Sequence, residues 1–200
     1  MEFRAVQEPV RTIKGLGKYH QAKAQTLDVE NRIVNCRDIF SGDTFDINYD
    51  FLVISAGCKT NTFAVPGVTQ EQQSTVFFLK HLYHARRIRD RILECFERAA
   101  SPVASEEERR DLLHFVVVGG GATSCEFATE LSEFLEKDVR KWYPDLADLV
   151  SLSIVEAGPN LLAGFDETCW QYYTKHLRAH NVDVRTGCAI VSVDPADDGR

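Results

Sequence analysis

The chain has 200 residues, 44% of them hydrophobic and 26% charged, which is enough for one domain or for parts of two. Its net charge of −7 argues against the clustered basic surface that nucleic-acid binding requires, so we expect no nucleic-acid partner. An acidic chain can still bind a dinucleotide, because backbone amides hold a pyrophosphate without any net positive charge.

Cysteine spacing and hydropathy exclude further classes of protein. The six cysteines contain no Cys-x-x-Cys pair, which argues against a zinc knuckle and predicts buried or half-buried free thiols in a reducing compartment. No apolar run approaches the ~20 residues of a transmembrane helix, and no targeting sequence follows Met1. His176 and His180, like His81 and His84, lack a third ligand, so we interpret them as surface pairs and expect no metal.

The first part of the chain is predicted to consist of strands. Residues 19–26, 32–36 and 45–49 carry the apolar alternation of strands and are separated by turn residues. Residues 51–57 are nearly all apolar, which is typical of a strand buried on both faces. A turn at residues 66–67 then marks a domain boundary, which divides the chain into residues 1–66 and 67–200.

The second part is predicted to alternate helices and strands. Apolar residues recur every three or four positions over about residues 80–100, which predicts an amphipathic helix. Residues 101–110 are predicted to be a polar, acidic connection. An apolar strand over residues 114–118 is followed by the glycine turn 119–121 and by a helix over residues 122–136.

A second strand and helix follow. Residues 137–150 are predicted to be a long connection, and residues 152–155 a second buried strand. Asp166 is a favourable N-cap for a helix that runs to about His180, and Asn181 is expected to end it in the left-handed conformation. Further strands are predicted over residues 182–185 and 189–193.

Strand, glycine turn, helix, strand and acidic residue form the dinucleotide-binding βαβ pattern. Gly119 permits a sharp turn, and Gly121 lets a pyrophosphate approach the backbone, where the first helical amides stabilise its charge. Glu156 is expected to accept hydrogen bonds from the adenine ribose and to repel a 2′-phosphate, which favours NADH over NADPH. The cofactor-binding residues predicted in this unit are Gly119, Gly120, Gly121, Ala122, Thr123, Ser124 and Glu156.

One position of the pattern departs from expectation. Ser124 takes the place of the third glycine, and its side chain adds bulk where helix and strand should pack closely. The long connection over residues 137–150 also lengthens the spacing to Glu156. The alternative that this βαβ unit binds no nucleotide therefore stays open.

Residues 112–131 closely resemble the second dinucleotide motif of eukaryotic type II NADH dehydrogenases, the rotenone-insensitive, single-chain NADH:ubiquinone oxidoreductases. This stretch is Leu-Leu-His-Phe-Val-Val-Val-Gly-Gly-Gly-Ala-Thr-Ser-Cys-Glu-Phe-Ala-Thr-Glu-Leu. The resemblance spans nearly the whole chain, because other stretches agree with the same family. These are residues 8–11, 49–57, 61–68, 78–80, 138–144 and 154–157.

The resemblance implies an α/β flavoprotein with two Rossmann-like dinucleotide-binding domains, in which hydride passes from NADH to FAD and electrons pass to ubiquinone without proton pumping. It assigns residues 1–66 to the FAD domain, with Ala56 and Gly57 near the flavin, and residues 67–200 to the NADH-binding domain. An ordinary buried strand is the alternative for residues 51–57. Peripheral attachment to the mitochondrial inner membrane is also implied, through C-terminal amphipathic helices, and a homodimer stays open.

By the same resemblance, Glu126 is the candidate catalytic residue. It matches a glutamate near the nicotinamide and flavin that helps to couple electron transfer to proton transfer. The alternative is that Glu126, Glu130, Glu133 and Lys137, which lie at helical spacing, form one solvated stripe.

Two departures from the family pattern carry expectations of their own. The family has Pro and Gly where this chain has Ala122 and Ser124. Its first FAD motif, its later FAD segment and its membrane anchor are expected outside these 200 residues, so we expect a fragment, incomplete at both ends and inactive by itself. Two alternatives remain: a ferredoxin-reductase-like or apoptosis-inducing-factor-like flavoprotein, and a degenerate, non-catalytic NAD-binding module. Glu126 and residues 142–144 favour the first interpretation, whereas Ser124 favours the degenerate module.

Overall fold

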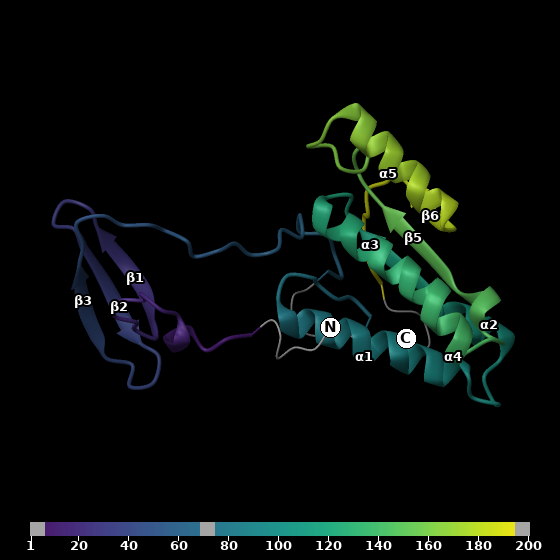
Figure 1. The fold of residues 1–200 in the computed structure, drawn as a ribbon, viewed down its shortest axis with the longest axis horizontal. Helices are drawn as coiled ribbons and strands as arrows, with labels where there is room; N and C mark the ends of the chain where they lie inside the picture. Colours follow the sequence, from purple (N-terminus) through teal and green to yellow (C-terminus); the bar gives the residue numbers. More distant parts are fainter. Residues whose placement is uncertain (1–6, 69–74, 195–200) are drawn as a thin grey trace. The chain divides into compact units, whose positions relative to one another are not determined.

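The computed structural model describes residues 7–68 and 75–194, and the chain divides into two compact units, Met1–Lys59 and Thr60–Arg200 (Figure 1). Each unit contains one three-stranded sheet. The predicted turn at residues 66–67 lies in the second unit, where the N–H of Val193 donates to the carbonyl of Pro66 at 2.9 Å. The assignment of residues 1–66 and 67–200 to two cofactor domains stays a prediction.

The first unit is an antiparallel sheet with strand order β1-β2-β3, preceded by the short 3-10 helix η2 (Val10–Thr12). Its strands are β1 (Ala22–Asp28), β2 (Ile33–Asp38) and β3 (Thr44–Asn48) (Figure 1). All three strands predicted from alternation are present, with shifted ends. Cys36 in β2 is buried.

The prediction of a buried strand over residues 51–57 is wrong. Phe51, Val53 and Ile54 are 95%, 86% and 74% exposed, and the segment belongs to no strand. A strand is buried on both faces only where neighbouring strands pair with it and other layers cover the sheet. No strand of the β1-β2-β3 sheet pairs with residues 51–57, so this apolar segment lacks the neighbours that would make it a buried strand.

The second unit is built on a parallel sheet with strand order β4-β5-β6, as expected for βαβ units. Its strands are β4 (His114–Val118), β5 (Ser151–Val155) and β6 (Val182–Arg185). Its longer helices are α1 (Leu82–Ala99), α2 (Glu106–Leu112), α3 (Ala122–Phe134) and α5 (Glu167–Ala179) (Figure 1).

One face of the parallel sheet carries the core. Val117 of β4 pairs with Ile154 of β5, which pairs with Val184 of β6, and alternate residues of each strand point to the same face. Helices α1, α3 and α5 contribute buried side chains to the same cluster, among them Phe96, Ala128 and Leu177, which are all 0% exposed. Burial of this apolar face is what fixes α3 against the sheet.

Helix α2 replaces the connection that was predicted over residues 101–110. The Ser105 side chain accepts a hydrogen bond from the Glu108 N–H at 3.1 Å and so caps the helix. Acidic residues fill the first turn and basic residues the last turn, which suits the helix dipole. The helix was missed because its polar sequence shows little apolar periodicity, although its cap is recognisable.

The connection predicted over residues 137–150 is also partly wrong. Helix α3 continues through the π-helical turn η3 (Leu135–Val139) into α4 (Arg140–Trp142), and the 3-10 helix η4 (Ala147–Leu149) follows. Val139 is fully buried, and its burial packs the η3 turn against the core. The strand predicted over residues 189–193 is absent as well.

The residues predicted to begin and end α5, Asp166 and Asn181, are confirmed in these roles. The carboxylate of Asp166 accepts a hydrogen bond from the N–H of Cys169 at 3.0 Å, as an N-cap residue does. Asn181 has a φ of 57°, which places it in the left-handed region after the helix ends.

Phe96 gives the clearest test of this core, because it is 0% exposed and its ring lies 5.2 Å from that of Tyr143 and 6.0 Å from that of Phe115. Replacement Phe96→Ala should lower the free energy of unfolding by about 3–5 kcal/mol, through lost burial and the cavity left behind. Phe165→Ala is the matched control, since Phe165 is 55% exposed, and should change stability by about 0.5 kcal/mol or less. Urea unfolding measures both; equal losses would contradict the packing described.

Candidate functional site

The glycine turn leaves β4 sharply and then opens toward solvent. Gly119 has a φ of +105°, a conformation that disfavours any side chain, and its N–H donates to the carbonyl of Val155 at 2.8 Å. Gly121 is the N-cap residue of α3, and a Cβ there would meet no atom within 4 Å. The backbone at Gly121 is therefore accessible to a ligand group.

The start of α3 presents backbone donors beside this open space. No side chain caps the helix, and its first intrahelical bond runs from the N–H of Cys125 to the carbonyl of Gly121 at 3.0 Å. The amides of Ala122, Thr123 and Ser124 therefore have no acceptor within the helix. Free amides at the positive end of a helix dipole suit an anion, so this cradle fits a pyrophosphate.

Gly120 lies at the closest approach of two chain segments. Its N–H donates to Oε2 of Glu156 at 2.5 Å, and its carbonyl accepts from the N–H of Leu162 at 2.7 Å. A Cβ at Gly120 would lie 2.8 Å from Cδ2 of Leu161 and 2.9 Å from Oε2 of Glu156. Only glycine lets the segment after β5 come this close to the turn.

Glu156, directly after β5, is held by both its backbone and its side chain. Its N–H donates to the carbonyl of Arg185 at 2.8 Å, and its carbonyl accepts from the N–H of Cys188 at 3.0 Å. Its Oε1 accepts from the N–H of Gly158 at 2.5 Å. A carboxylate has about four acceptor positions, so the two amides that it binds leave capacity for ribose hydroxyls.

Ser124 is accommodated at the turn. A Cβ on Gly119 would lie 3.3 Å from Oγ of Ser124, which shows that the serine side chain occupies space beside the bare Cα of Gly119. Helix α3 still packs its buried residues Cys125 and Ala128 on the sheet. The serine therefore does not prevent the close approach that the third glycine of the pattern serves.

Glu126 is exposed on the first turns of α3, next in sequence to the buried Cys125. Further along the helix, Lys137 donates to Glu133 at 2.5 Å across one turn, which agrees with a solvated stripe for that part. A catalytic role for Glu126 stays a prediction.

A tyrosine that was not singled out from the sequence links α5 to α3. The hydroxyl of Tyr173 donates to the carbonyl of Cys125 and lies 2.7 Å from Oγ1 of Thr129. Burial raises the pKa of Tyr173 to about 12, so the hydroxyl keeps its proton and its role as a donor at neutral pH. The pair spans 48 residues of sequence, and no local pattern indicates it.

Ala56 and Gly57 belong to the first unit, where both are exposed. Gly57 has a φ of +73°, and a Cβ there would meet no atom within 4 Å. The backbone at Gly57 is thus open to an approaching group, while its proximity to a flavin stays a prediction.

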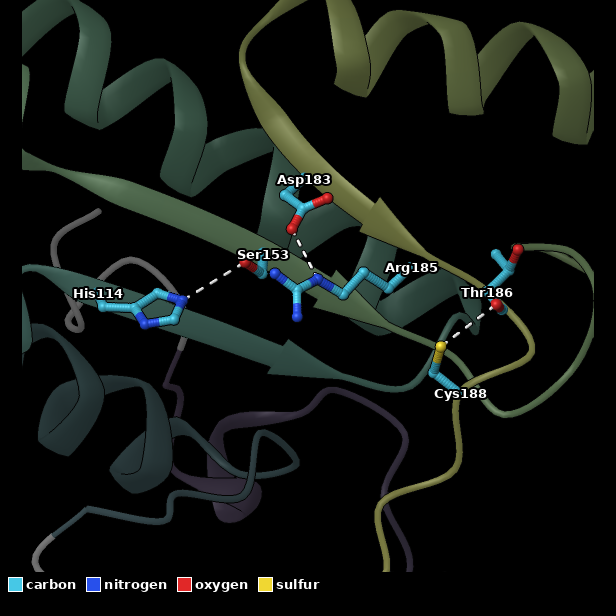
Figure 2. Close-up of polar contacts among 6 residues, drawn as sticks. All are labelled: His114, Ser153, Asp183, Arg185, Thr186 and Cys188. Atoms are coloured by element: carbon cyan, nitrogen blue, oxygen red, sulfur yellow. Dashed lines mark hydrogen bonds and ion pairs between the residues drawn. The ribbon is translucent and has the colours of Figure 1, made fainter. Parts of the chain in front are cut away.

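Figure 2 shows polar contacts among six residues that lie on the strands of the second unit or just after β6. Nε of Arg185 donates to the carboxylate of Asp183 at 2.7 Å on β6, and Nε2 of His114 on β4 lies 3.5 Å from Oγ of Ser153 on β5. Across residues 7–68 and 75–194, no group of three or more His, Cys, Asp or Glu side chains could hold a metal ion. None of the helices described there is long and apolar enough to cross a membrane.

Comparison with known proteins decides the family. The family model for pyridine nucleotide-disulphide oxidoreductases matches residues 4–199. The chain belongs to this family. The predicted Rossmann-like α/β flavoprotein fold is thereby confirmed.

Proteins that are similar to this chain over nearly its whole length are named as NADH- or NAD(P)H-ubiquinone oxidoreductases. The chain is 39% identical over 202 residues to an external alternative NAD(P)H-ubiquinone oxidoreductase B1, mitochondrial, of Solanum tuberosum, with 96% of the chain and 34% of that protein covered. It is 36% identical over 201 residues to external NADH-ubiquinone oxidoreductase 2, mitochondrial, of Saccharomyces cerevisiae, with 98% and 36% covered.

The solved structure of NDH2 from Plasmodium falciparum in complex with NADH is similar as well, with a TM-score of 0.77, 34% identity, and 88% of the chain and 35% of that protein covered. These relatives confirm the resemblance inferred from residues 112–131. The chain spans about a third of their length.

The tight contact at Gly120 leads to a stability prediction. Gly120→Ala should lower the free energy of unfolding by about 1–3 kcal/mol, because the added methyl group must displace Leu161 or the Glu156 side chain. Gly164→Ala is the matched control, since a Cβ at Gly164 meets no atom within 4 Å, and its effect should stay near about 0.5 kcal/mol. Thermal and urea unfolding of both variants check this; tolerance of Gly120→Ala would show that the approach is looser than described.

The thiols of the second unit should differ in their dependence on pH. Burial raises the pKa of Cys125 to about 11, so at pH 8 it stays protonated and unreactive, and only a rise in pH toward that value generates the thiolate. Cys169 and Cys188 are exposed. Iodoacetamide at pH 8, followed by peptide mass spectrometry, should label Cys169 and Cys188 well before Cys125. Labelling in urea is the control, because it should remove the difference; rapid native labelling of Cys125 would refute the prediction.

Proposed function

We propose that this chain supplies the NADH-binding part of a flavin-dependent NADH:ubiquinone oxidoreductase. The observation that carries the proposal is the uncapped start of α3 beside the open backbone at Gly121, with the carboxylate of Glu156 at the adjoining strand end. The names of the relatives from Solanum tuberosum and Saccharomyces cerevisiae support ubiquinone as the electron acceptor. The complex of the Plasmodium falciparum protein supports NADH as the donor.

The residues of the glycine turn have separate tasks in this proposal. The amides of Ala122, Thr123 and Ser124 bind the pyrophosphate, and Gly121 leaves room for it next to the backbone. Glu156 accepts hydrogen bonds from the adenine ribose through its remaining acceptor positions. A negative carboxylate there disfavours a 2′-phosphate, so NADH is the preferred donor.

FAD is the second proposed cofactor. When both cofactors are bound, NADH supplies a hydride to the flavin, and the electrons continue to the quinone. Ala56 and Gly57 are proposed to lie near the flavin, which the open backbone at Gly57 supports. Glu126, exposed beside the start of α3, is proposed to hold or move a proton near the reacting rings.

The cellular setting is proposed from the same relatives. Both named relatives are mitochondrial, and we place this protein at the mitochondrial inner membrane. Peripheral attachment to that membrane and assembly as a homodimer belong to the same proposal. Bound-flavin absorbance and NADH:ubiquinone turnover, measured on the full-length protein, test the whole assignment; a full-length protein without flavin or turnover would overturn it.

Coenzyme preference tests the role of Glu156 in that full-length protein. Wild type should prefer NADH over NADPH. Glu156→Arg should shrink or invert this preference by roughly tenfold or more, because the arginine attracts the 2′-phosphate of NADPH that the glutamate repels. Glu130→Arg makes the same change of charge at an exposed residue of α3, away from the end of β5, and should leave the preference unaltered. The ratio of kcat/KM for the two coenzymes is the readout. An unchanged ratio in Glu156→Arg would mean that Glu156 does not face the ribose.

A further inference from the structure

We propose that Glu156 is also a positioning residue for the pyrophosphate turn, which its carboxylate holds in shape before a nucleotide arrives. This inference rests on the proposed function, because it concerns the same dinucleotide site. It adds a second role to a residue that is otherwise expected only to accept hydrogen bonds from the adenine ribose. The carboxylate joins the turn after β4 to the segment after β5 through the amides of Gly120 and Gly158.

The contacts hold both peptide groups that flank the Cα of Gly120. Oε2 of Glu156 accepts the Gly120 N–H at 2.5 Å, and the Leu162 N–H donates to the Gly120 carbonyl at 2.7 Å. Leu162 adopts a φ of 52°, a left-handed conformation uncommon for leucine, in the segment that makes this second bond. Glu156 and Leu162 both belong to the stretch that follows β5, and the thiol of Cys125 in α3 lies 3.5 Å from the same Gly120 carbonyl, so the stretch after β5 holds most of the turn.

The charge of Glu156 makes its contribution specific. Hydrogen bonds from N–H groups to an ionised carboxylate are roughly twice as strong as those between neutral groups. Glutamine at this position would keep one acceptor oxygen but would set its NH2 group against the second N–H donor. The buried Gly120 amide or the Gly158 amide would then lose its partner, and the turn would no longer be held on that side.

If Glu156 positions the turn, removing its charge should change the affinity for a diphosphate in the opposite direction from the one that electrostatic repulsion alone predicts. Removing a negative charge near a diphosphate should by itself tighten diphosphate binding. Loss of the positioned turn should weaken it, because the amides of α3 must then be ordered during binding. A ligand that lacks the ribose hydroxyls separates this effect from the loss of ribose contacts.

The experiment compares ADP with 2′,3′-dideoxy-ADP as ligands of the full-length protein, by calorimetric titration. Glu156→Gln should weaken the binding of both ligands, and of dideoxy-ADP by about fivefold to tenfold. Asp183→Asn is the matched control, since Asp183 is a half-exposed carboxylate that pairs with Arg185, and should leave both affinities within about twofold. If Glu156→Gln weakens ADP but binds dideoxy-ADP as well as wild type does, Glu156 acts only through the ribose and the inference is overturned.

Two further measurements test whether the conformation of the turn depends on Glu156. Hydrogen exchange without nucleotide should be faster at the Gly120 and Gly158 amides in Glu156→Gln, and unchanged exchange would overturn the inference. Gly158→Ala keeps the carboxylate but places a Cβ 3.1 Å from Oε1 of Glu156, so it should weaken dideoxy-ADP binding in a folded protein. Unchanged affinity in Gly158→Ala would likewise overturn the inference. A wild type that binds neither ADP nor NADH would instead overturn the proposed function itself.

Discussion

The close approach at Gly120 is the constraint on which the rest of the second unit depends. The end of β4, the start of α3 and the segment after β5 meet at this residue, and a Cβ there would lie 2.8 Å from Leu161, which is fully buried. Absence of a side chain lets the N–H and the carbonyl of Gly120 form hydrogen bonds with Glu156 and Leu162 at the same time. The direction of α3, and with it the direction of its free amides, follows from this contact and from the burial of α3 on the sheet.

Where a feature depends on local sequence, it could be predicted. Strand β4 occupies the predicted residues 114–118, and α3 begins at Ala122, because an apolar run followed by glycines fixes both. The Asp166 cap and the left-handed Asn181 follow from capping chemistry that involves only neighbouring residues. The family fold was inferred from the resemblance of residues 112–131 and is confirmed, whereas the nucleotide-binding residues at the turn stay predictions.

Where a feature depends on distant partners, prediction failed. The apolar residues 51–57 have the composition of a buried strand, but a strand forms only against neighbours, and Phe51 is left 95% exposed. The bond between Gly120 and Glu156 spans 36 residues, and that between Tyr173 and Cys125 spans 48. Sequence spacing placed Glu156 at the end of its strand, but spacing carries no information about the amides toward which its carboxylate turns.

Ser124 shows how a departure from a motif can be absorbed. The third glycine of the dinucleotide pattern permits close packing of helix on strand, yet here Oγ of Ser124 lies beside Gly119, whose missing Cβ and φ of +105° leave the space it needs. The glycines of the turn are therefore not interchangeable in their tasks. Gly119 receives a neighbouring side chain, Gly120 admits the segment after β5, and Gly121 alone faces open space.

In the proposed site, coenzyme selectivity and the shape of the turn are coupled, because one carboxylate is assigned to both. An acidic residue that only faced the ribose could be exchanged for arginine with no effect beyond the choice of coenzyme. Glu156 also binds the amides of Gly120 and Gly158, so any replacement that alters its charge removes a support of the turn that orients the α3 amides. Tyr173 adds a second support from α5 to the same helix, at the carbonyl of Cys125. The glycine turn and the start of α3 are thus contacted by side chains from two later parts of the chain, Glu156 after β5 and Tyr173 in α5, so the conformation of the candidate nucleotide site depends on residues well beyond the glycine turn.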